Sequence, residues 1–197
     1  MQPKFQRNFY PNLLSWSELE FLINVRPLMS QDRVKILVNK NIEFAWDCPV
    51  WQLDKNTYPP TLLRHLLNKY VCYFHDMSRA TKNINDVCNE LEKQYNRQTD
   101  AHIYLCRNTK LKKHPFGIHS DESDNVIIQC EGVTNFKVLD TNDKLIFDVD
   151  MKTGDAIWIP MYYPHLATSK TKRLSVSFPI CDKPIQADHD RAWVTLD

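Results

Sequence analysis

The stretch that decides the fold is 154–165, which reads GDAIWIPMYYPH. Its first two residues, glycine and aspartate, form turns readily, and the apolar run 156–159 that follows is typical of a buried strand. Pro160 ends that strand because proline cannot donate a hydrogen bond to a neighbouring strand. The chain then turns again, and His165 opens another strand. This stretch therefore predicts two strands, the second of which begins with an imidazole.

The region around this stretch has the character of a β protein from 101 to 180. Short runs rich in Val, Ile, Phe and Tyr alternate with turn-forming residues, and such evenly spaced strands favour a sandwich or a barrel. The predicted strands are centred on 102–106, 126–130, 133–139, 145–149, 156–159 and 173–178.

Three segments nearer the N-terminus carry the signals of helices. Ser15 opens the first with a capping box, and a pair of prolines precedes the second, 62–70, whose leucines fall on one stripe. The third, 81–97, has an apolar stripe opposite a polar face. Between the first two helices, alternating apolar residues at 34–38 and 42–46 predict two short strands.

The length of the chain fits one domain. It has 197 residues, of which 43% are hydrophobic, and this is enough to bury a substantial core. We expect a helical part at 1–100 that packs on a β core at 101–180, followed by a polar tail at 181–197. The predicted fold class is therefore mainly β with N-terminal helices.

Charge and hydropathy exclude several classes of protein. The 25 Lys and Arg nearly balance the 24 Asp and Glu, so no overall field attracts the chain to nucleic acid or to a membrane surface. No apolar stretch is long enough to span a bilayer. The N-terminus lacks the apolar segment of a secretory signal, and no two of the six cysteines are closer than 16 residues. We therefore expect reduced thiols and an intracellular, cytoplasmic location.

The candidate metal ligands are His119, Asp121 and His165. A His-x-Asp pair on a strand would put both side chains on one face, and a distant histidine from another strand would complete a set of three. Two imidazoles and one carboxylate, with open positions opposite them, are the facial triad that holds Fe(II) in non-haem oxygenases. Taken alone, the run 119–124 is more typical of an Asx-type turn than of a metal site, and the surrounding motifs reverse that preference.

Four ordered motifs together resemble the JmjC-type cupin oxygenases, in particular their hydroxylase branch. The stretch 154–165 is similar to the second cupin motif, with Tyr162 at the place of its middle glycine. The resemblance covers about 100–180. Its motifs are the His-x-Asp pair, the segment 124–139 with Gln129 and Gly132, the stretch 154–165 and the strand 173–178.

The resemblance implies a double-stranded β-helix, the jelly-roll or cupin core, in which His119, Asp121 and His165 hold Fe(II) as the catalytic centre. 2-Oxoglutarate would chelate the iron as cosubstrate, and O2 would oxidise a C–H bond of a protein side chain or a small molecule. Two other classes remain open at this point. One is a cupin metalloenzyme that does not use 2-oxoglutarate, and the other is a non-catalytic binding module of the same fold.

One position departs from the family pattern. Fifteen residues after His119 the family usually has a Lys or Arg that pairs with the distal carboxylate of 2-oxoglutarate, and this chain has Thr134. Arg173 is the candidate replacement, because it shares strand parity with Ser175 and Ser177 and all three can face the barrel interior. The alternative is that Arg173 is a solvated residue at the end of a strand.

The resemblance suggests roles for two more cosubstrate residues. Tyr104 lies where the family often has a tyrosine that hydrogen-bonds the same carboxylate, and Asn125 where related enzymes sometimes have an active-site asparagine. A core tyrosine and a turn residue are the alternatives. The basic loop 107–114 could receive an acidic substrate, or it is simply solvated.

Overall fold

The computed structural model describes most of the chain. The described residues are 1–25, 29, 33–38, 41–42, 57–108 and 117–184. Parts of three predicted features lie outside them: most of the strand at 42–46, the basic loop beyond Asn108, and the tail beyond Pro184.

The three predicted helices are present. They are α1 (Trp16–Ile23), α2 (Pro60–Lys69) and α3 (Lys82–Tyr95). Ser15 caps α1, since its hydroxyl accepts from the Glu18 amide at 3.2 Å while the Glu18 carboxylate accepts from the Ser15 amide at 2.8 Å. None of the described helices combines the length and apolar character that crossing a bilayer requires.

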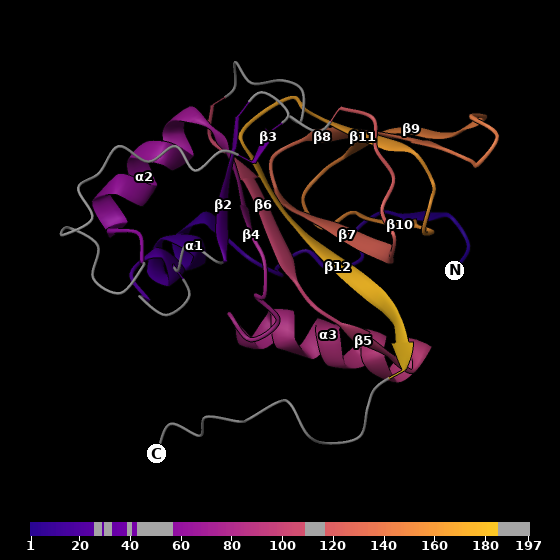
Figure 1. Ribbon diagram of the computed structural model, residues 1–197, viewed down its shortest axis with the longest axis horizontal. Helices are drawn as coiled ribbons and strands as arrows, with labels where there is room; N and C mark the ends of the chain where they lie inside the picture. The colour runs from indigo at the N-terminus through magenta and orange to yellow at the C-terminus, as the bar shows by residue number, and fades with distance from the viewer. Residues whose placement is uncertain (26–28, 30–32, 39–40, 43–56, 109–116, 185–197) are drawn as a thin grey trace.

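The described strands form two antiparallel sheets, and β12 (Arg173–Pro184) runs through the centre of the larger one (Figure 1). On one side of β12 lie β7 (Asp124–Glu131), β10 (Ala156–Ile159) and β1 (Lys4–Gln6). On its other side lie β6 (His102–Cys106), β4 (Val71–Phe74), β2 (Val34–Val38) and β3 (Asn41–Ile42), and β5 (Arg97–Thr99) pairs with the end of β12.

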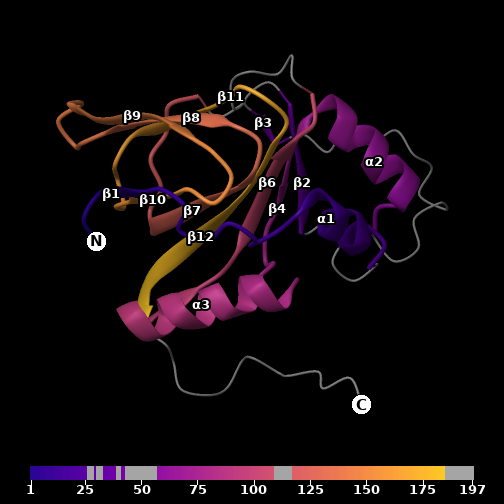
Figure 2. The ribbon, with the colours of Figure 1, turned by 180° about the vertical axis from the view of Figure 1, so that it is seen from behind.

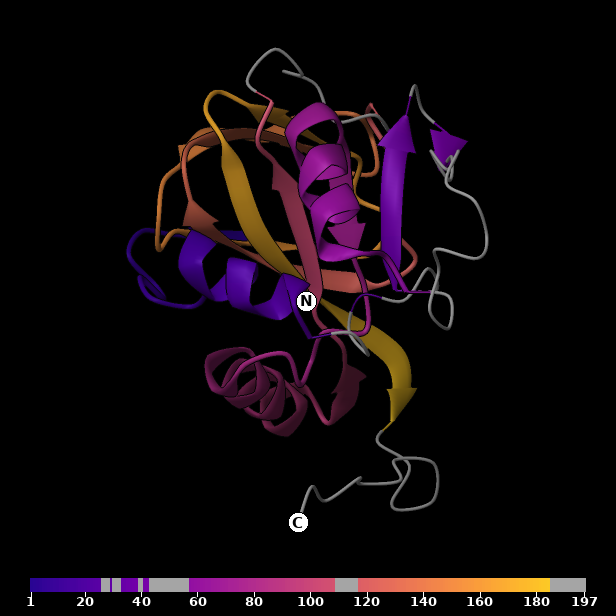
Figure 3. The same cartoon turned by 90° about the vertical axis from the view of Figure 1, so that its left-hand side faces the viewer.

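The smaller sheet has the order β11 (His165–Ser169), β8 (Thr134–Leu139) and β9 (Leu145–Met151). It faces one side of the large sheet, whereas the helices cover the other side, as Figure 2 and Figure 3 show from behind and from the helical side. The two sheets enclose a small apolar core that includes Ile127, Phe136 and Ala167. This arrangement is the double-stranded β-helix that the sequence motifs predict.

The two faces of β12 differ in chemistry, as its alternation predicts. Leu174, Val176 and Phe178 are fully buried in the core under the helices. The alternate residues of the strand, which begin with Arg173, face the smaller sheet. Because side chains along a strand alternate in direction, one strand serves both a structural core and a polar interior.

Three strands of the N-terminal part were not predicted, and β12 is longer than expected. β1 pairs with β10, β4 pairs with β6, and β5 pairs with the extension of β12 to Pro184. The first 100 residues therefore widen the large sheet as well as supplying helices. The sequence alone did not indicate this, because β1 and β5 are short and polar and β4 directly follows α2.

Two backbone positions of the cupin motifs are conformationally special. Gly132 has φ +82°, and a Cβ there would lie only 1.8 Å from the carbonyl oxygen of Lys172, so only glycine fits. Tyr162, at the place of the motif's middle glycine, keeps the left-handed conformation with φ +64°. Its amide donates to the Asp121 carbonyl at 2.8 Å, which ties the two metal-ligand loops together.

Candidate metal centre

The backbone brings His119 and His165 face to face. His165 begins β11, and it forms an isolated antiparallel bridge with His119 through hydrogen bonds of 3.1 and 2.7 Å. The ring centroids are 4.4 Å apart. The prediction that His-x-Asp lies on a regular strand is wrong, because only His119 makes a bridge and Asp121 lies in irregular backbone before a bend at 122–123. The three side chains nevertheless converge.

Both histidines present Nε2 to Asp121, because Nδ1 of each ring contacts a backbone carbonyl. Nδ1 of His119 lies 3.1 Å from the Gly117 carbonyl oxygen, and Nδ1 of His165 lies 3.0 Å from that of Tyr163. A carbonyl can only accept, so each Nδ1 carries a proton and each Nε2 is the nitrogen left to face Asp121. These backbone bonds fix the ring orientation in the way that metal-bound histidines require.

The three side chains fit a divalent ion. The ligand atoms of His119, Asp121 and His165 all lie within 4.8 Å of one another, and this is the only such cluster found among the described residues. Nε2 of His165 is 3.6 Å from Oδ2 of Asp121, and Nε2 of His119 is 4.0 Å from Oδ1. These gaps are too long for hydrogen bonds but suit ligands about 2.1 Å from a shared ion. The donor set, two nitrogens and a carboxylate, matches Fe(II).

Burial keeps His165 in the form that binds metal. Its side chain is buried, and this burial, together with the neighbouring His119, lowers its pKa below the usual range. A histidine with a lowered pKa is neutral at pH 7, and the neutral imidazole is the ligand form. Asp121 supplies the negative charge that the cation needs.

Asn125 contacts Asp121 directly. It belongs to β7 and is 4% exposed, which contradicts the alternative that it is a turn residue. Its Nδ2 donates to Oδ2 of Asp121 at 2.8 Å, while its Oδ1 accepts from the Ser177 hydroxyl at 3.0 Å. Asn125 is not among the residues that line the cavity, so it reaches the centre through Asp121.

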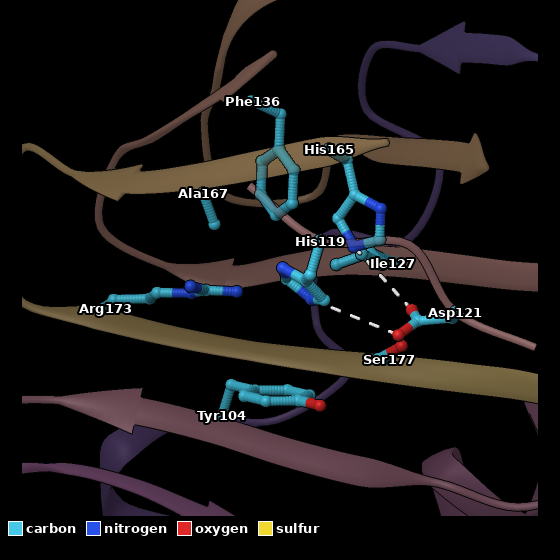
Figure 4. A pocket seen from close by; sticks show the side chains of 9 residues that line it. All are labelled: Tyr104, His119, Asp121, Ile127, Phe136, His165, Ala167, Arg173 and Ser177. Atoms are coloured by element: carbon cyan, nitrogen blue, oxygen red, sulfur yellow. Dashed lines mark ion pairs between the residues drawn. The ribbon is translucent and has the colours of Figure 1, made fainter. Parts of the chain in front are cut away.

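The metal ligands open into a cavity between the two sheets (Figure 4). Arg173 lies across the cavity from Asp121, and its guanidinium points toward His119. The lining residues are Tyr104, His119, Asp121, Ile127, Phe136, His165, Ala167, Arg173 and Ser177.

Arg173 is a buried cation at this cavity. It is 4% exposed, which contradicts the alternative of a solvated strand end, and burial lowers its pKa to about 10. Its Nε donates to the Ser175 hydroxyl at 2.9 Å, and no carboxylate of the described residues pairs with it. A buried, unpaired guanidinium is costly, and an anionic ligand would relieve that cost.

Aromatic rings fix the direction of this guanidinium. Its central carbon lies 5.6 Å from the ring centroid of Tyr104 and 5.5 Å from that of Phe136, on opposite sides in Figure 4. Burial also raises the pKa of Tyr104, so its hydroxyl stays protonated and can donate to an anion.

Thr134 lies on the inward side of β8, two residues from Phe136. It is fully buried and its hydroxyl has no hydrogen-bond partner. Thr134 does not line the cavity. Ser175 does not line it either, but its hydroxyl accepts from Arg173, which does. The position on β8 where the resemblance leads us to expect a cation therefore holds the neutral Thr134, while Arg173 of β12 brings a cation to the cavity.

The structure adds a hydrogen-bonded chain that the sequence did not reveal. The Tyr73 hydroxyl lies 3.3 Å from Nδ1 of His102, and Nε2 of His102 lies 3.0 Å from the Asp100 carboxylate. The Tyr73 ring stacks on Tyr104 with centroids 4.9 Å apart. The alternation of β6 could have pointed to His102, but its partners become visible only once β4 is placed beside it.

Comparison with known proteins finds similar structures but no similar sequences. No family model matches the chain, and no curated protein matches its sequence. Among solved structures, YcfD, a ribosomal oxygenase from Escherichia coli, is similar with a TM-score of 0.63 at 15% identity. Its complex with cobalt and 2-oxoglutarate gives 0.64 at 14% identity, and its complex with cobalt and succinic acid gives 0.63 at 14%.

The similarity extends over nearly the whole of this chain. It covers 93% of the chain but 49% of YcfD, so the chain spans about half the length of that protein. At such low identity the likeness speaks for the fold. The chain therefore has the fold of YcfD, the double-stranded β-helix that its motifs predict.

Proposed function

We propose that this protein is an Fe(II)- and 2-oxoglutarate-dependent oxygenase that hydroxylates a protein side chain or a small molecule. The observation that carries the proposal is the pairing of a His–Asp–His triad with a buried, carboxylate-free arginine in one cavity. The triad suits Fe(II), and Arg173 suits an acid. A ligand that needs both is a keto acid with a second carboxylate.

The residues around the cavity divide the work of binding. His119, Asp121 and His165 would hold Fe(II), which when bound supplies the redox chemistry that activates O2. Arg173 would grip the distal carboxylate of 2-oxoglutarate through its planar fork, with Tyr104 as a second donor. Phe136 and Ile127 line the space between these groups with apolar surface, which would limit the water there. An excluded-water site strengthens each of these charged contacts.

The similar structure supports the cosubstrate by analogy. YcfD has been solved with cobalt and 2-oxoglutarate, and with cobalt and succinic acid. The name of that protein calls it a ribosomal oxygenase. For this chain, the substrate class remains a protein side chain or a small molecule.

An anaerobic titration tests the proposal. The protein with Fe(II) should develop a weak visible charge-transfer band when 2-oxoglutarate is added. Zn(II) has a filled d shell and no accessible redox state, so the same titration with Zn(II) should give no band. If Fe(II) binds but 2-oxoglutarate neither binds nor produces the band, the chain is instead a cupin metalloenzyme without this cosubstrate.

A second experiment addresses the hydroxylated substrate. Candidate proteins and small molecules are incubated with the iron-loaded protein, 2-oxoglutarate and O2, and mass spectra are searched for a gain of 16 Da. The gain should disappear when 2-oxoglutarate is omitted. Tight binding of metal and 2-oxoglutarate without any turnover of the cosubstrate would favour a binding module.

We also propose an intracellular location. The five described cysteines are free thiols, four of them buried, and Cys48 lies outside the described residues. Free thiols are typical of reducing compartments. Thiol titration of the unfolded protein without reductant should find six, and two missing thiols would argue for an oxidising compartment.

A further inference from the structure

The amide of Asn125, beside the candidate metal ligands, has hydrogen-bond partners for both its nitrogen and its oxygen. Asn125 is almost fully buried, and both ends of its amide are engaged. Its Nδ2 donates to Asp121 at 2.8 Å and to the Ser123 carbonyl at 3.3 Å, and its Oδ1 accepts from Ser177 at 3.0 Å. A buried amide with every polar atom satisfied has one defined orientation.

Asp121 decides which way the amide faces. Oδ2 of Asp121 accepts, so the nitrogen of the amide must face it, and Oδ1 then accepts from the Ser177 hydroxyl. Rotating the amide by 180° would put its oxygen against the carboxylate and lose the contact with Asp121. Ser177 holds the far end of the amide in this orientation.

The hydrogen bonds from Ser177 through Asn125 end at one carboxylate oxygen of Asp121. Asn125 binds Oδ2 of Asp121, the oxygen that lies 3.6 Å from Nε2 of His165, while Oδ1 lies 4.0 Å from Nε2 of His119. Asp121 is partly exposed, so without Asn125 its carboxylate would be free to rotate toward solvent. Residues that hold metal ligands in place typically contribute about 10–100-fold to metal affinity.

We infer that Asn125, held in place by Ser177, is a positioning residue that fixes the Asp121 carboxylate as a metal ligand. The inference rests on the proposed function, because it requires that the triad bind a metal. It assigns Asn125 a role different from the cosubstrate contact suggested by its sequence position. It also gives a role to a buried asparagine of β7 that does not line the cavity.

Metal affinity is the direct test, with Mn(II) as a redox-stable probe followed by its EPR signal. Asn125→Leu, which has similar volume but no amide, should weaken Mn(II) binding about 10–100-fold. Ser177→Ala leaves the amide in place but removes the hydrogen bond to its Oδ1, the loss of about one ordinary hydrogen bond, and it should weaken binding less, on the order of threefold. Thermal unfolding of the metal-free variants shows whether they remain folded.

The chain offers a matched control. Asn135 also donates to carboxylates, with its Nδ2 2.9 Å from Asp148 and 3.0 Å from Asp150, but it lies on the outer side of β8. Asn135→Leu should leave Mn(II) affinity unchanged. A purely structural role for Asn125 would lower the unfolding temperature and leave the affinity of the folded protein intact.

The outcomes separate this inference from the proposed function. If the parent does not bind Mn(II), the metal centre itself is wrong. If the parent binds and folded Asn125→Leu binds equally well, the positioning role is overturned. Should Asn125→Leu not fold, Ser177→Ala decides, and parent-like affinity in that variant overturns the role in the same way.

Discussion

The two ends of the cavity relate to the sequence in different ways. At the metal end, all three ligands stand at the positions that the cupin motifs predict, and the fold brings them together. At the other end, Thr134 stands at the position on β8 where a cation was expected, and the cation that lines the cavity is Arg173 of β12. The first end has the residues that the motifs predict, whereas the second has a cation on a different strand from the one that the resemblance implies.

This difference indicates that a metal site constrains residue positions more strictly than a carboxylate-binding site does. A facial metal site needs three donor atoms around one point, so each ligand position is fixed by geometry. A distal carboxylate needs only a cation and donors within reach, and a long side chain can arrive from any strand that lines the cavity. We therefore expect the metal end to tolerate no change and the cation end to tolerate rearrangement.

The largest effect should come from a metal ligand. His165→Ala removes one of three donors, so stoichiometric Mn(II) binding should be lost while the fold remains. Calorimetric titration with Mn(II) measures this, and His65→Ala, at an exposed position on α2, is the control. Full-affinity binding by His165→Ala would mean that the metal lies elsewhere.

The next effect belongs to the cation end. Arg173→Ala leaves the distal carboxylate buried without a partner, a loss of roughly 3–5 kcal/mol. 2-Oxoglutarate binding to the Mn(II)-loaded protein should weaken by about two to three powers of ten, with Mn(II) affinity nearly unchanged. Arg173→Lys should recover part of the loss, because a point charge lacks the fork.

The control for Arg173 is a surface arginine. Arg64→Ala removes a cation that pairs with Glu20 away from the cavity, and it should bind 2-oxoglutarate as the parent does. If both arginine variants behave like the parent, Arg173 is not the clamp. Lys110, Lys112 and Lys113 of the basic loop would then be the next cations to replace.

A smaller effect is expected for the tyrosine beside the arginine. Tyr104→Phe keeps the ring that packs near the Arg173 guanidinium and removes one hydrogen bond to a charged group, about 1.5–3 kcal/mol. 2-Oxoglutarate affinity should fall by about 10- to 150-fold. A loss as large as that of Arg173→Ala would show that Tyr104, and not the arginine, dominates the clamp.

The smallest effect is expected when a cation is returned to β8 in a variant that has lost the cation on β12. Thr134→Lys introduced into Arg173→Ala returns a cation to the family's usual position, on the inward side of β8. It should tighten 2-oxoglutarate binding about tenfold relative to Arg173→Ala, the value of one charged hydrogen bond. No recovery in a folded double variant would indicate that the two positions do not serve one carboxylate.

The sequence predicted what local patterns and ordered motifs can specify. Sequence patterns revealed helix caps such as Ser15, the alternation of β12 and the three side chains that cluster as candidate metal ligands. Strand β5 was not, because its polar residues become a strand only through pairing with β12. The Asn125–Asp121 contact was also hidden, since it depends on how a bend after His119 folds against β7. Contacts made by tertiary packing leave no periodic signal.

The most direct test of the account compares two keto acids on two proteins. 2-Oxopentanoate has the same chain length as 2-oxoglutarate but lacks its distal carboxylate. The Mn(II)-loaded parent should prefer 2-oxoglutarate by about a hundredfold or more, and Arg173→Ala should lose most of this preference. A preference that survives unchanged in Arg173→Ala would contradict the claim that this arginine and the metal triad hold the two ends of one cosubstrate.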